Sequence, residues 1–293
     1  MNINFIKNKK IKIGIIGGKL QGFEVAYLAK IENYDITIID KKKFVISKLF
    51  SNKFICFDIT KHLKKYLDIV NKMDYIIPTN ENTKTLKFIF KHKDKLKCKL
   101  IFDFNSYWKS RNKKISKEIF KLLGFKTPLE SPKNPPFIIK PIDQSGSIGV
   151  KLIKNNKQKF IIPKNYLVEQ YIEGPIISLE IFGNGNIYNT SIETVVHIDE
   201  IYDCYKVTTY KENNYYRTIG LKIAKYINLN GIMDIEAIEN NNNLYLLEID
   251  ARFPSQTPIC VYHSSGMNLI KELISLKKNI VNNHYNLNNY CIV

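Results

Sequence analysis

Five ionisable side chains alternate with apolar residues in two short stretches of the second half of the chain. They are Asp234 and Glu236 in the first stretch, and Glu248, Asp250 and Arg252 in the second. Period-two spacing predicts that the members of each stretch lie on one face of a β-strand. An Asn-rich turn at 240–243 joins the two strands as a hairpin, so we expect the four carboxylates and the arginine to converge.

Convergence of four carboxylates indicates phosphoryl chemistry that is assisted by a metal ion. Like charges this close repel one another unless cations lie between them. Carboxylate oxygens shared with nucleotide phosphates are typical ligands of Mg²⁺, and a nearby arginine stabilises charge on a phosphoryl group in transfer. The alternative is an outward-facing charged hairpin, but the apolar residues between the acids require a buried opposite face. The predicted Mg²⁺ ligands are Glu236, Glu248 and Asp250, and the predicted catalytic residues are Arg252, Glu236 and Glu248.

A second group of polar residues precedes the acids and suits phosphate and nucleotide binding. A strand that ends in Lys140 is followed by a Ser- and Gly-rich loop at 143–150, which suits phosphate capture, although a plain hairpin loop is the alternative. Lys113, on the helix before it, is a further candidate phosphate contact, but a single lysine in so lysine-rich a chain carries little signal. The strand at 166–170 ends in acidic and polar groups, so its backbone could contact an adenine edge and its acid a ribose.

Three glycines follow the first strand, at positions 17, 18 and 22, and permit backbone amides to approach an anion. Asp40 ends the second strand 22 residues after Gly18, where dinucleotide-binding folds place a ribose-binding acid. The spacing is not GxGxxG, so the alternative that these glycines only permit tight strand–helix packing stays open, and nicotinamide chemistry is disfavoured. The predicted adenine-nucleotide contacts are Lys19, Asp40, Asp58 and Ile59, and the predicted amino-acid contacts are Leu20, Gln21 and Glu81.

The elements that position these residues fall into two parts. The first hundred residues alternate between strands and helices, which predicts a parallel sheet covered on both faces. The expected strands are 11–16, 35–39, 54–57, 75–77 and 100–102, and the expected helices are 21–31, 61–71 and 83–93. Beyond them we expect one helix at 110–123 and then paired strands of an α+β region. These strands are 137–140, 149–153, 166–170, 176–182, 186–194, 232–238 and 244–249, with helices at 211–227 and 267–276.

Composition excludes several classes of protein. The formal net charge is +18, but only three of the 45 Lys and Arg residues are Arg, and no short basic run is interleaved with aromatics. We therefore expect no nucleic-acid partner. No apolar run approaches 18 residues, so we expect no membrane-spanning helix. Five cysteines without a CxxC pair indicate reduced thiols in a cytoplasmic protein, and the five histidines lack zinc-site spacing.

The order of these pieces resembles that of the ATP-grasp ligases. The resemblance implies a Rossmann-like domain at 1–103 and an ATP-grasp domain at 104–293, with a small lid subdomain at about 126–175. It also implies ATP and Mg²⁺ as the nucleotide and the metal ion. Together with the chemistry above, it assigns ATP contacts to Lys113, Lys140, Ser145, Gly146, Ser147, Glu169, Gln170, Tyr171, Ile172, Ser178 and Glu180.

Within that family, residues 10–292 resemble the ligases of pyrrolysine biosynthesis, most closely in GGKLQGFE (17–24), GIMDIEAI (231–238) and EIDARFPSQTP (248–258). The resemblance implies that an acyl phosphate of 3-methyl-D-ornithine is formed from ATP and captured by the ε-amine of L-lysine. One alternative is another carboxylate–amine ligase of this fold that acts on different amino acids. The other is an inactive short homologue, because the ligases of pyrrolysine biosynthesis carry a further small region after the segment matching 290–292. The remaining candidate substrate contacts are Asp199, Glu200 and Asp203 for ammonium groups, and Arg252, Ser255, Gln256 and Thr257 for carboxylates.

Overall fold

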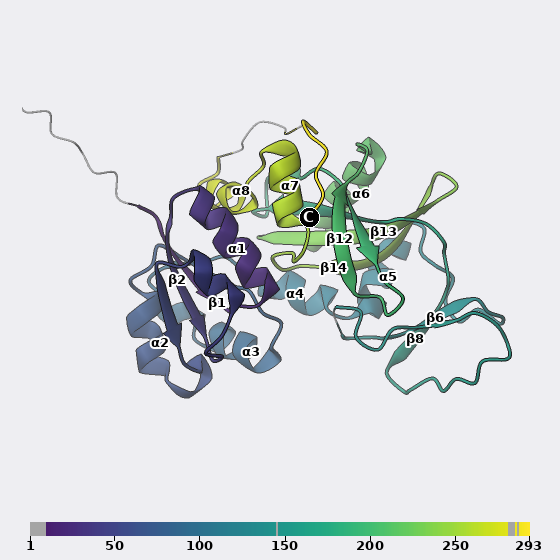
Figure 1. Ribbon diagram of the computed structural model, residues 1–293, viewed down its shortest axis with the longest axis horizontal. Coiled ribbons are helices and arrows are strands. Elements are labelled where there is room, and N and C mark those ends of the chain that lie inside the picture. The colour runs from purple at the N-terminus through teal and green to yellow at the C-terminus, as the bar shows by residue number, and fades with distance from the viewer. Residues whose placement is uncertain (1–9, 145, 281–284, 286) are drawn as a thin grey trace, which may run out of the picture. The chain divides into compact units, whose positions relative to one another are not determined.

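The computed structural model describes residues 10–144, 146–280, 285 and 287–293. The chain forms two compact units, and the first ends at Phe102 and the second begins at Asp103 (Figure 1). The expected mixture of one parallel sheet and later antiparallel sheets is confirmed. None of the helices in the described ranges is both long and apolar enough to cross a membrane.

The first unit contains a five-stranded parallel sheet in the order β3-β2-β1-β4-β5. Its central strand β1 is buried on both faces from Ile13 to Ile16, as its three isoleucines and one glycine allow. Crossover helices are needed because parallel neighbours cannot be joined by tight turns. The strands are β1 (Lys12–Ile16), β2 (Asp35–Asp40), β3 (Lys53–Cys56), β4 (Tyr75–Pro78) and β5 (Lys99–Leu100), and the helices are α1 (Leu20–Ile31), α2 (Leu63–Val70) and α3 (Thr83–Lys91).

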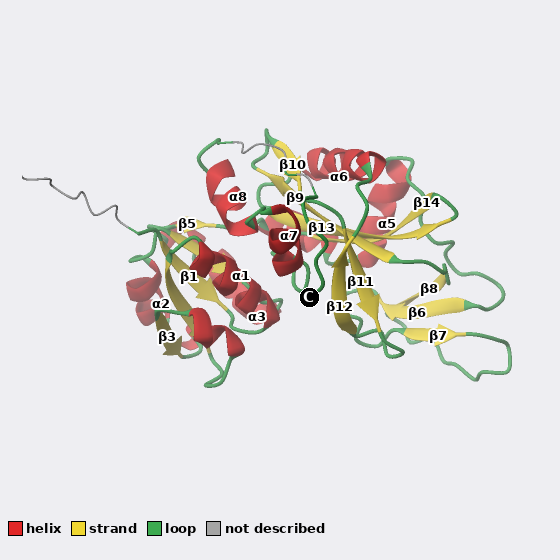
Figure 2. Ribbon diagram, turned by 45° about the horizontal axis from the view of Figure 1, so that its top comes forward, coloured by secondary structure: helices red, strands yellow, loops and turns green. Residues whose placement is uncertain are grey.

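The second unit contains two antiparallel sheets, which Figure 2 shows in yellow. The larger sheet has the order β12-β11-β9-β13-β14, with β10 paired to β9, and the smaller one has the order β7-β6-β8. The larger sheet is made of β9 (Ile176–Gly183), β10 (Tyr188–Thr190), β11 (Thr194–Ile198), β12 (Cys204–Thr209), β13 (Ile232–Asn240) and β14 (Asn243–Asp250). The smaller sheet is made of β6 (Phe137–Pro141), β7 (Lys151–Ile153) and β8 (Tyr166–Gln170).

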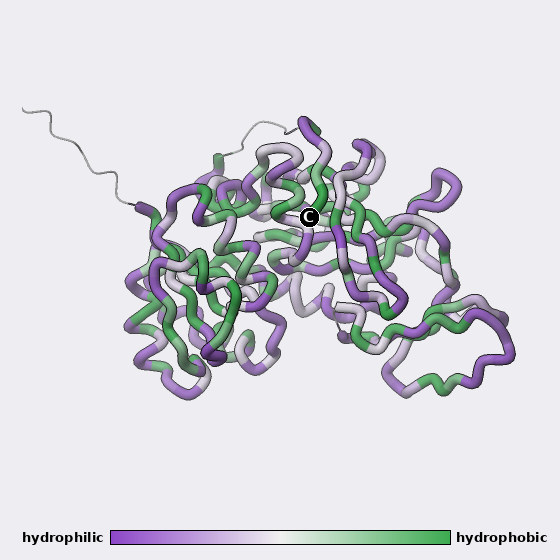
Figure 3. Tube along the Cα trace, viewed as in Figure 1, coloured by the Kyte–Doolittle hydropathy of each residue, from purple (hydrophilic) through white to green (hydrophobic). Residues whose placement is uncertain are grey.

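The hairpin of β13 and β14 is fixed by its turn. Asn241 and Asn242 both have positive φ angles, of 48° and 61°, which is the backbone that a type I′ turn requires. Asparagine tolerates this left-handed conformation better than most residues. The turn is hydrophilic in Figure 3, whereas the strands behind it are largely apolar. The turn starts the pairing, and a β-bulge between Glu236 and Ala237 then shifts it by one residue, so that Glu236 lies opposite Glu248.

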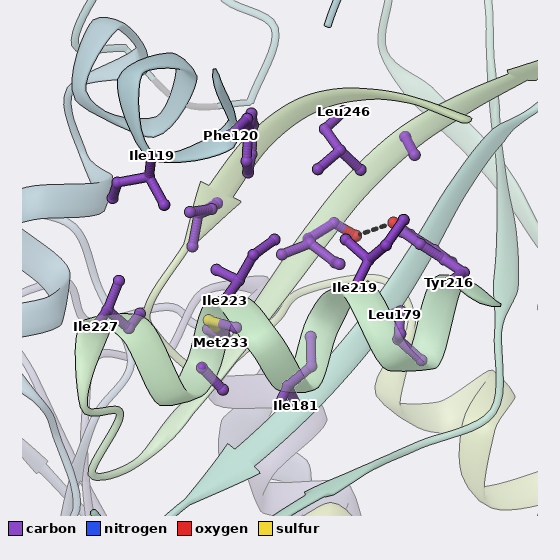
Figure 4. Packing of buried hydrophobic residues seen from close by; sticks show 14 of the residues in the cluster. Ile119, Phe120, Leu179, Ile181, Tyr216, Ile219, Ile223, Ile227, Met233 and Leu246 are labelled. Carbon is purple, nitrogen blue, oxygen red and sulfur yellow. Dashed lines mark hydrogen bonds between the residues drawn. The ribbon is translucent and has the colours of Figure 1, made fainter. Parts of the chain in front are cut away.

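The core of the second unit lies between two helices and one face of the larger sheet (Figure 4). Side chains from α5 (Lys113–Leu122) and α6 (Asn214–Ile227) pack against those of β9, β13 and β14. Tyr216 is fully buried there, and its hydroxyl donates to the carbonyls of Ile235 at 2.7 Å and Ile177 at 3.1 Å. Because this face of β13 and β14 is core, the acids that alternate with it lie on the opposite face.

Three expectations about elements are wrong in detail. The helix expected at 110–123 is α5, which begins only at Lys113 because the side chain of Asn112 accepts from the amide of Lys114 and caps its start; a separate helix that was not expected, α4 (Phe104–Ser110), precedes it. The strand expected at 186–194 is divided between β10 and β11. A helix not expected at all, α7 (Pro258–Ser265), begins with proline and precedes α8 (Leu269–Leu276).

Candidate functional site

Two rows of polar residues cross the face of the larger sheet that lies opposite the hydrophobic core. Register places Asp234 of β13 opposite Asp250 of β14, and Glu236 opposite Glu248. On the other side of β13, strand β9 adds Glu180 beside Asp234 and a serine beside Glu236. The predicted placement of the four carboxylates on one face is therefore confirmed.

Two cations engage this acid cluster, defined as Asp234, Glu236, Glu248 and Asp250. Arg252 lies beyond β14, with Nη1 3.2 Å from an Asp234 oxygen and Nη2 2.8 Å from an Asp250 oxygen. Lys113, the first residue of α5, forms an ion pair with Glu248. Lys140 also lies near enough to lower the pKa of Glu248, so among the described residues three cations face four carboxyl groups.

Electrostatics at the acid cluster reflect this imbalance. Burial, followed by repulsion from Glu248 and Asp250, raises the pKa of Glu236 to about 8. Burial also raises the pKa of Asp234 well above its usual range, against the attraction of Arg252. Burial acts on Glu248 in the same direction, but the nearby ammonium groups, that of Lys113 first, hold its pKa below the ordinary value. The cluster therefore favours additional positive charge, as a proton or as a metal ion.

The predicted Mg²⁺ ligands do not by themselves enclose a metal. Throughout the described ranges, no group of three or more His, Cys, Asp or Glu side chains is arranged so that it could hold a metal ion. Glu248 is ion-paired with Lys113 and Asp250 with Arg252 in this structure. The donor set nevertheless fits a hard divalent cation, provided that a nucleotide supplies phosphate oxygens as the remaining ligands.

A buried charge network lies next to the acid cluster and contains a residue that the sequence did not single out. Glu169 of β8 is bridged by Lys140 of β6 at 2.7 Å and by Lys117 of α5 at 2.8 Å. Lys117 follows Lys113 by one helical turn, so both lie on the same face of α5. That i, i+4 spacing was the available signal, but it is weak in a chain this rich in lysine. The carboxylate of Glu169 is thus paired with two lysines in this structure, and its contact with a ribose stays a prediction.

The Ser- and Gly-rich loop lies beside Lys113. The ammonium of Lys113 donates to the carbonyl of Gln144 at 2.8 Å, which ties the start of α5 to the start of the loop. Gly146 and Ser147 have positive φ angles of 65° and 56°. Ser145, which was predicted to contact phosphate, lies outside the described residues.

The segment that follows β8 is held mainly through its backbone. The amide of Gln170 donates to the carbonyl of Leu129, and the amide of Tyr171 donates to that of Pro136. The Gln170 side chain is exposed and Ile172 is buried. These contacts place the predicted adenine-binding segment at one end of the smaller sheet.

Several other predicted contacts are used within the protein. Glu180 is completely buried and accepts hydrogen bonds from the hydroxyls of Ser191 and Thr257. Thr257 is therefore committed to Glu180 instead of being a free donor for a substrate carboxylate, and Glu180 is equally committed. Ser178 is also buried, whereas Ser255 and Gln256 are half-buried just before α7.

Three predicted ammonium partners lie in the hairpin that joins β11 and β12. Asp199, Glu200 and Asp203 are exposed there. One oxygen of Asp199 accepts from the amides of Ile201 and Asp203, both at 2.9 Å, and this shapes the turn. Glu200 and Asp203 are thus the better placed of the three for a ligand from solvent.

Packing explains the glycines of the first unit. A Cβ on Gly22 would lie 2.1 Å from the carbonyl oxygen of Gly17, and one on Gly18 would lie 2.6 Å from the side chain of Val45. The amide of Gly18 donates to a carboxylate oxygen of Asp40 at 2.7 Å, so in this structure these two groups bind each other and not a ligand. These contacts favour the alternative of tight packing over a phosphate loop.

The remaining first-unit predictions separate into two groups. Asp58 accepts from the amide and the hydroxyl of Thr60, and Ile59 is buried in the core. One oxygen of Asp58 is thus used within the loop and Ile59 within the core, whereas Lys19 and Leu20 are exposed at the start of α1. The second group is brought together: the buried Gln21 donates to Glu81 at 3.3 Å.

Known proteins with a similar sequence or fold include ATP-grasp proteins and structures with bound ADP. Residues 110–256 match the ATP-grasp domain family. An N5-carboxyaminoimidazole synthetase from Staphylococcus aureus, complexed with ADP, is 20% identical and has a TM-score of 0.76, covering 97% of this chain and 82% of that one. The biotin carboxylase domain of a 2-oxoglutarate carboxylase from Hydrogenobacter thermophilus, in complex with MgADP, has the same TM-score at 16% identity, covering 97% and 74%. These structures share the fold.

Sequence similarity is more specific. A 3-methyl-D-ornithine–L-lysine ligase from Methanosarcina barkeri is 43% identical over 261 residues, which are 89% of this chain and 72% of that ligase. A ligase of the same name from Methanosarcina mazei is 42% identical over 89% of this chain and 70% of its own length. The chain therefore belongs to the ATP-grasp family and, within it, to the family of 3-methyl-D-ornithine–L-lysine ligases.

Proposed function

We propose that this chain uses ATP to join the carboxylate of 3-methyl-D-ornithine to the ε-amine of L-lysine, as a step of pyrrolysine biosynthesis. The observation that carries the proposal is the row of four carboxylates beside Arg252 and Lys113, in a chain that is 43% identical to a ligase of that name. Free thiols at all five cysteines accord with the cytoplasmic location that we propose for it.

The chemistry needs no covalent nucleophile from the protein. A carboxylate oxygen of the ornithine substrate attacks the γ-phosphorus while the bond to ADP breaks, which gives an acyl phosphate. The lysine nitrogen then attacks the acyl carbon, the carbon–oxygen bond to phosphate breaks, and the amine proton passes to a base. Arg252, held toward the cluster by Asp234 and Asp250, would stabilise the charge that develops on the transferred group.

The chain's own groups would hold the nucleotide at the junction of the two antiparallel sheets. Lys113 and Lys140 would contact its phosphates; in support, Lys113 donates to the carbonyl of Gln144 at the start of the loop with Gly146 and Ser147, and Lys140 is paired with Glu169. We propose that Glu236, Glu248 and Asp250 hold Mg²⁺ together with the phosphates, where the ion would neutralise charge in phosphoryl transfer. The region at about 126–175, which includes the smaller sheet, would act as the lid over the nucleotide.

Each amino-acid substrate is zwitterionic and needs groups of both charges. The pair of Gln21 and Glu81 offers an amide and a carboxylate side by side, so we propose that it binds lysine. Exposed Glu200 and Asp203 are the proposed ammonium partners in the second unit. Ser255 and Gln256, just past Arg252, are the proposed donors to a substrate carboxylate.

The test is a reconstitution with oxygen labelling. The purified chain is incubated with Mg-ATP, L-lysine and 3-methyl-D-ornithine whose carboxylate carries ¹⁸O, and the products are analysed by mass spectrometry. We expect a condensed dipeptide that requires all three substrates, attachment at the ε-nitrogen by fragmentation, and transfer of one ¹⁸O to phosphate. ADP without a dipeptide would contradict the substrate assignment, and unlabelled phosphate alongside dipeptide would contradict the acyl phosphate.

A further inference from the structure

The carboxylate of Glu169 is shared by two buried lysines, of which only Lys140 has a role in the proposed reaction. Glu169 has one ammonium at each oxygen, Lys117 at 2.8 Å from Oε1 and Lys140 at 2.7 Å from Oε2. The side chains of Lys117 and Glu169 are 1% and 3% exposed. Such a group is expensive to build, because each charge loses its hydration and must be compensated by the others.

The two lysines differ in what they can do next. Lys140 is 9% exposed and adjoins the acid cluster, since its charge also lowers the pKa of Glu248. Lys117 is on α5, enclosed among core-facing residues, and its contact in this network is Glu169. If Lys140 turns toward a phosphate, the Glu169 carboxylate loses one of its two ammonium groups and keeps the other.

We propose that Lys117 is a positioning residue for ATP: by keeping Glu169 paired, it allows Lys140 to leave that carboxylate and bind phosphate. Without Lys117, the departure of Lys140 would strand a buried carboxylate, so Glu169 and ATP would compete for one ammonium group. The inference rests on the proposed function, because it takes Lys140 as a phosphate contact.

Charge balance supports the exchange. The three ionised groups sum to one positive charge, and two ammonium groups on one carboxylate repel each other. Burial lowers the pKa of Lys117 and Lys140 lowers it further, while Glu169 opposes both. Movement of Lys140 to an anionic phosphate relieves the repulsion and leaves a neutral pair of Lys117 and Glu169.

The test is a double-mutant cycle in which the dissociation constant of ATP is measured by calorimetry on the full chain. Lys117→Met keeps the length of the side chain and removes the charge, and we expect it to weaken ATP binding at least about tenfold. Lys117→Met combined with Glu169→Gln should bind ATP within about threefold of Glu169→Gln alone, because a neutral residue 169 needs no ammonium. The matched control is Lys121→Met, one turn further along α5, whose exposed side chain pairs with Glu130 and should leave ATP affinity unchanged.

The outcomes separate this inference from the proposed function. If Lys140→Met leaves ATP affinity unchanged, the phosphate role of Lys140 is wrong and both fall. If Lys140→Met weakens binding but Lys117→Met has the same effect in both backgrounds, Lys117 only packs and the inference alone is overturned. If Lys117→Met does not fold, the comparison of the double variant with Glu169→Gln still decides, since a difference above about threefold contradicts the proposal.

Discussion

Replacing Arg252 separates the chemical step from nucleotide binding. Its guanidinium lies 3.2 Å from Asp234 and 2.8 Å from Asp250, and its side chain is only 10% exposed. Arg252→Met removes the charge and keeps a similar apolar stem, whereas Arg252→Lys keeps the charge and loses the planar fork. The first variant therefore measures the charge, and the second measures its geometry.

The size of the effect follows from burial. Removal of one preorganised group that stabilises developing charge lowers the rate by roughly 10²–10³, or about 3–4 kcal/mol. Loss of one partner from a buried ion pair costs about 3–5 kcal/mol of stability. Burial already raises the pKa of Asp234, so this carboxyl can take a proton, and we expect the lower end of that range. A domain of ordinary stability remains folded after such a loss.

The assay is single-turnover formation of the dipeptide by rapid quench, with urea unfolding of each variant in parallel. We expect Arg252→Met to lower kcat and kcat/KM by the same factor, because the interaction is made in the transition state. Arg252→Lys should lie between it and the parent, with about a tenfold loss. A folded Arg252→Met that forms dipeptide within fivefold of the parent refutes the reasoning, and so does a raised KM for ATP with kcat unchanged.

Three other substitutions test other parts of the site. Glu248→Gln should lower ligation at least about a hundredfold without loss of the folded circular dichroism spectrum, and retained turnover would exclude it as a metal ligand. Glu81→Gln should raise KM for lysine about tenfold, since its partner Gln21 alone offers no negative charge; an equal loss of ATP affinity in calorimetry would contradict its placement. Gly22→Ala should destabilise the first unit by about 1–3 kcal/mol in urea unfolding, because its Cβ would lie 2.1 Å from the Gly17 oxygen; parent-like stability would show that the loop yields easily.

The acid cluster could be predicted from the sequence because one physical constraint settles it. Residues that alternate with Ile235 and Ile249 must lie on the opposite face from the core, and both of these isoleucines are completely buried. The face of the acids therefore follows from the pattern. Their pairing does not, because Glu236 lies opposite Glu248 only through a β-bulge between Glu236 and Ala237, which the alternating pattern does not indicate.

The buried network around Glu169 could not be predicted in the same way. Its members come from a helix and two strands, and the pairing depends on how these pack, which periodicity does not encode. Lys117 looks like any solvated lysine in a chain with a formal charge of +18. Only its 1% exposure, a tertiary property, distinguishes it from Lys121 one turn away, which is 58% exposed.

The glycine-rich loop shows the opposite situation, in which a functional interpretation and a packing interpretation share one pattern. Glycine permits a close ligand and a close neighbour equally well. The structure places neighbours there, with the carbonyl of Gly17 against Gly22 and the Asp40 carboxylate on the amide of Gly18. Asp40 was predicted as a ligand-binding acid because it follows Gly18 by 22 residues in the sequence. Its carboxylate does lie at the glycine-rich loop, but in this structure it accepts a hydrogen bond from the loop's own backbone.

Both lysines that we assign to phosphates are paired with protein carboxylates in this structure. Lys113 is paired with Glu248 and Lys140 with Glu169, so under this assignment each ammonium exchanges a carboxylate for a phosphate when ATP binds. For Glu169 the second lysine remains after the exchange. Glu248 would need no second ammonium group if a divalent cation binds with the nucleotide, because the carboxylate released by Lys113 would then be a ligand of that cation. Nucleotide and metal ion would then favour each other's binding, since each satisfies the charge that the other displaces.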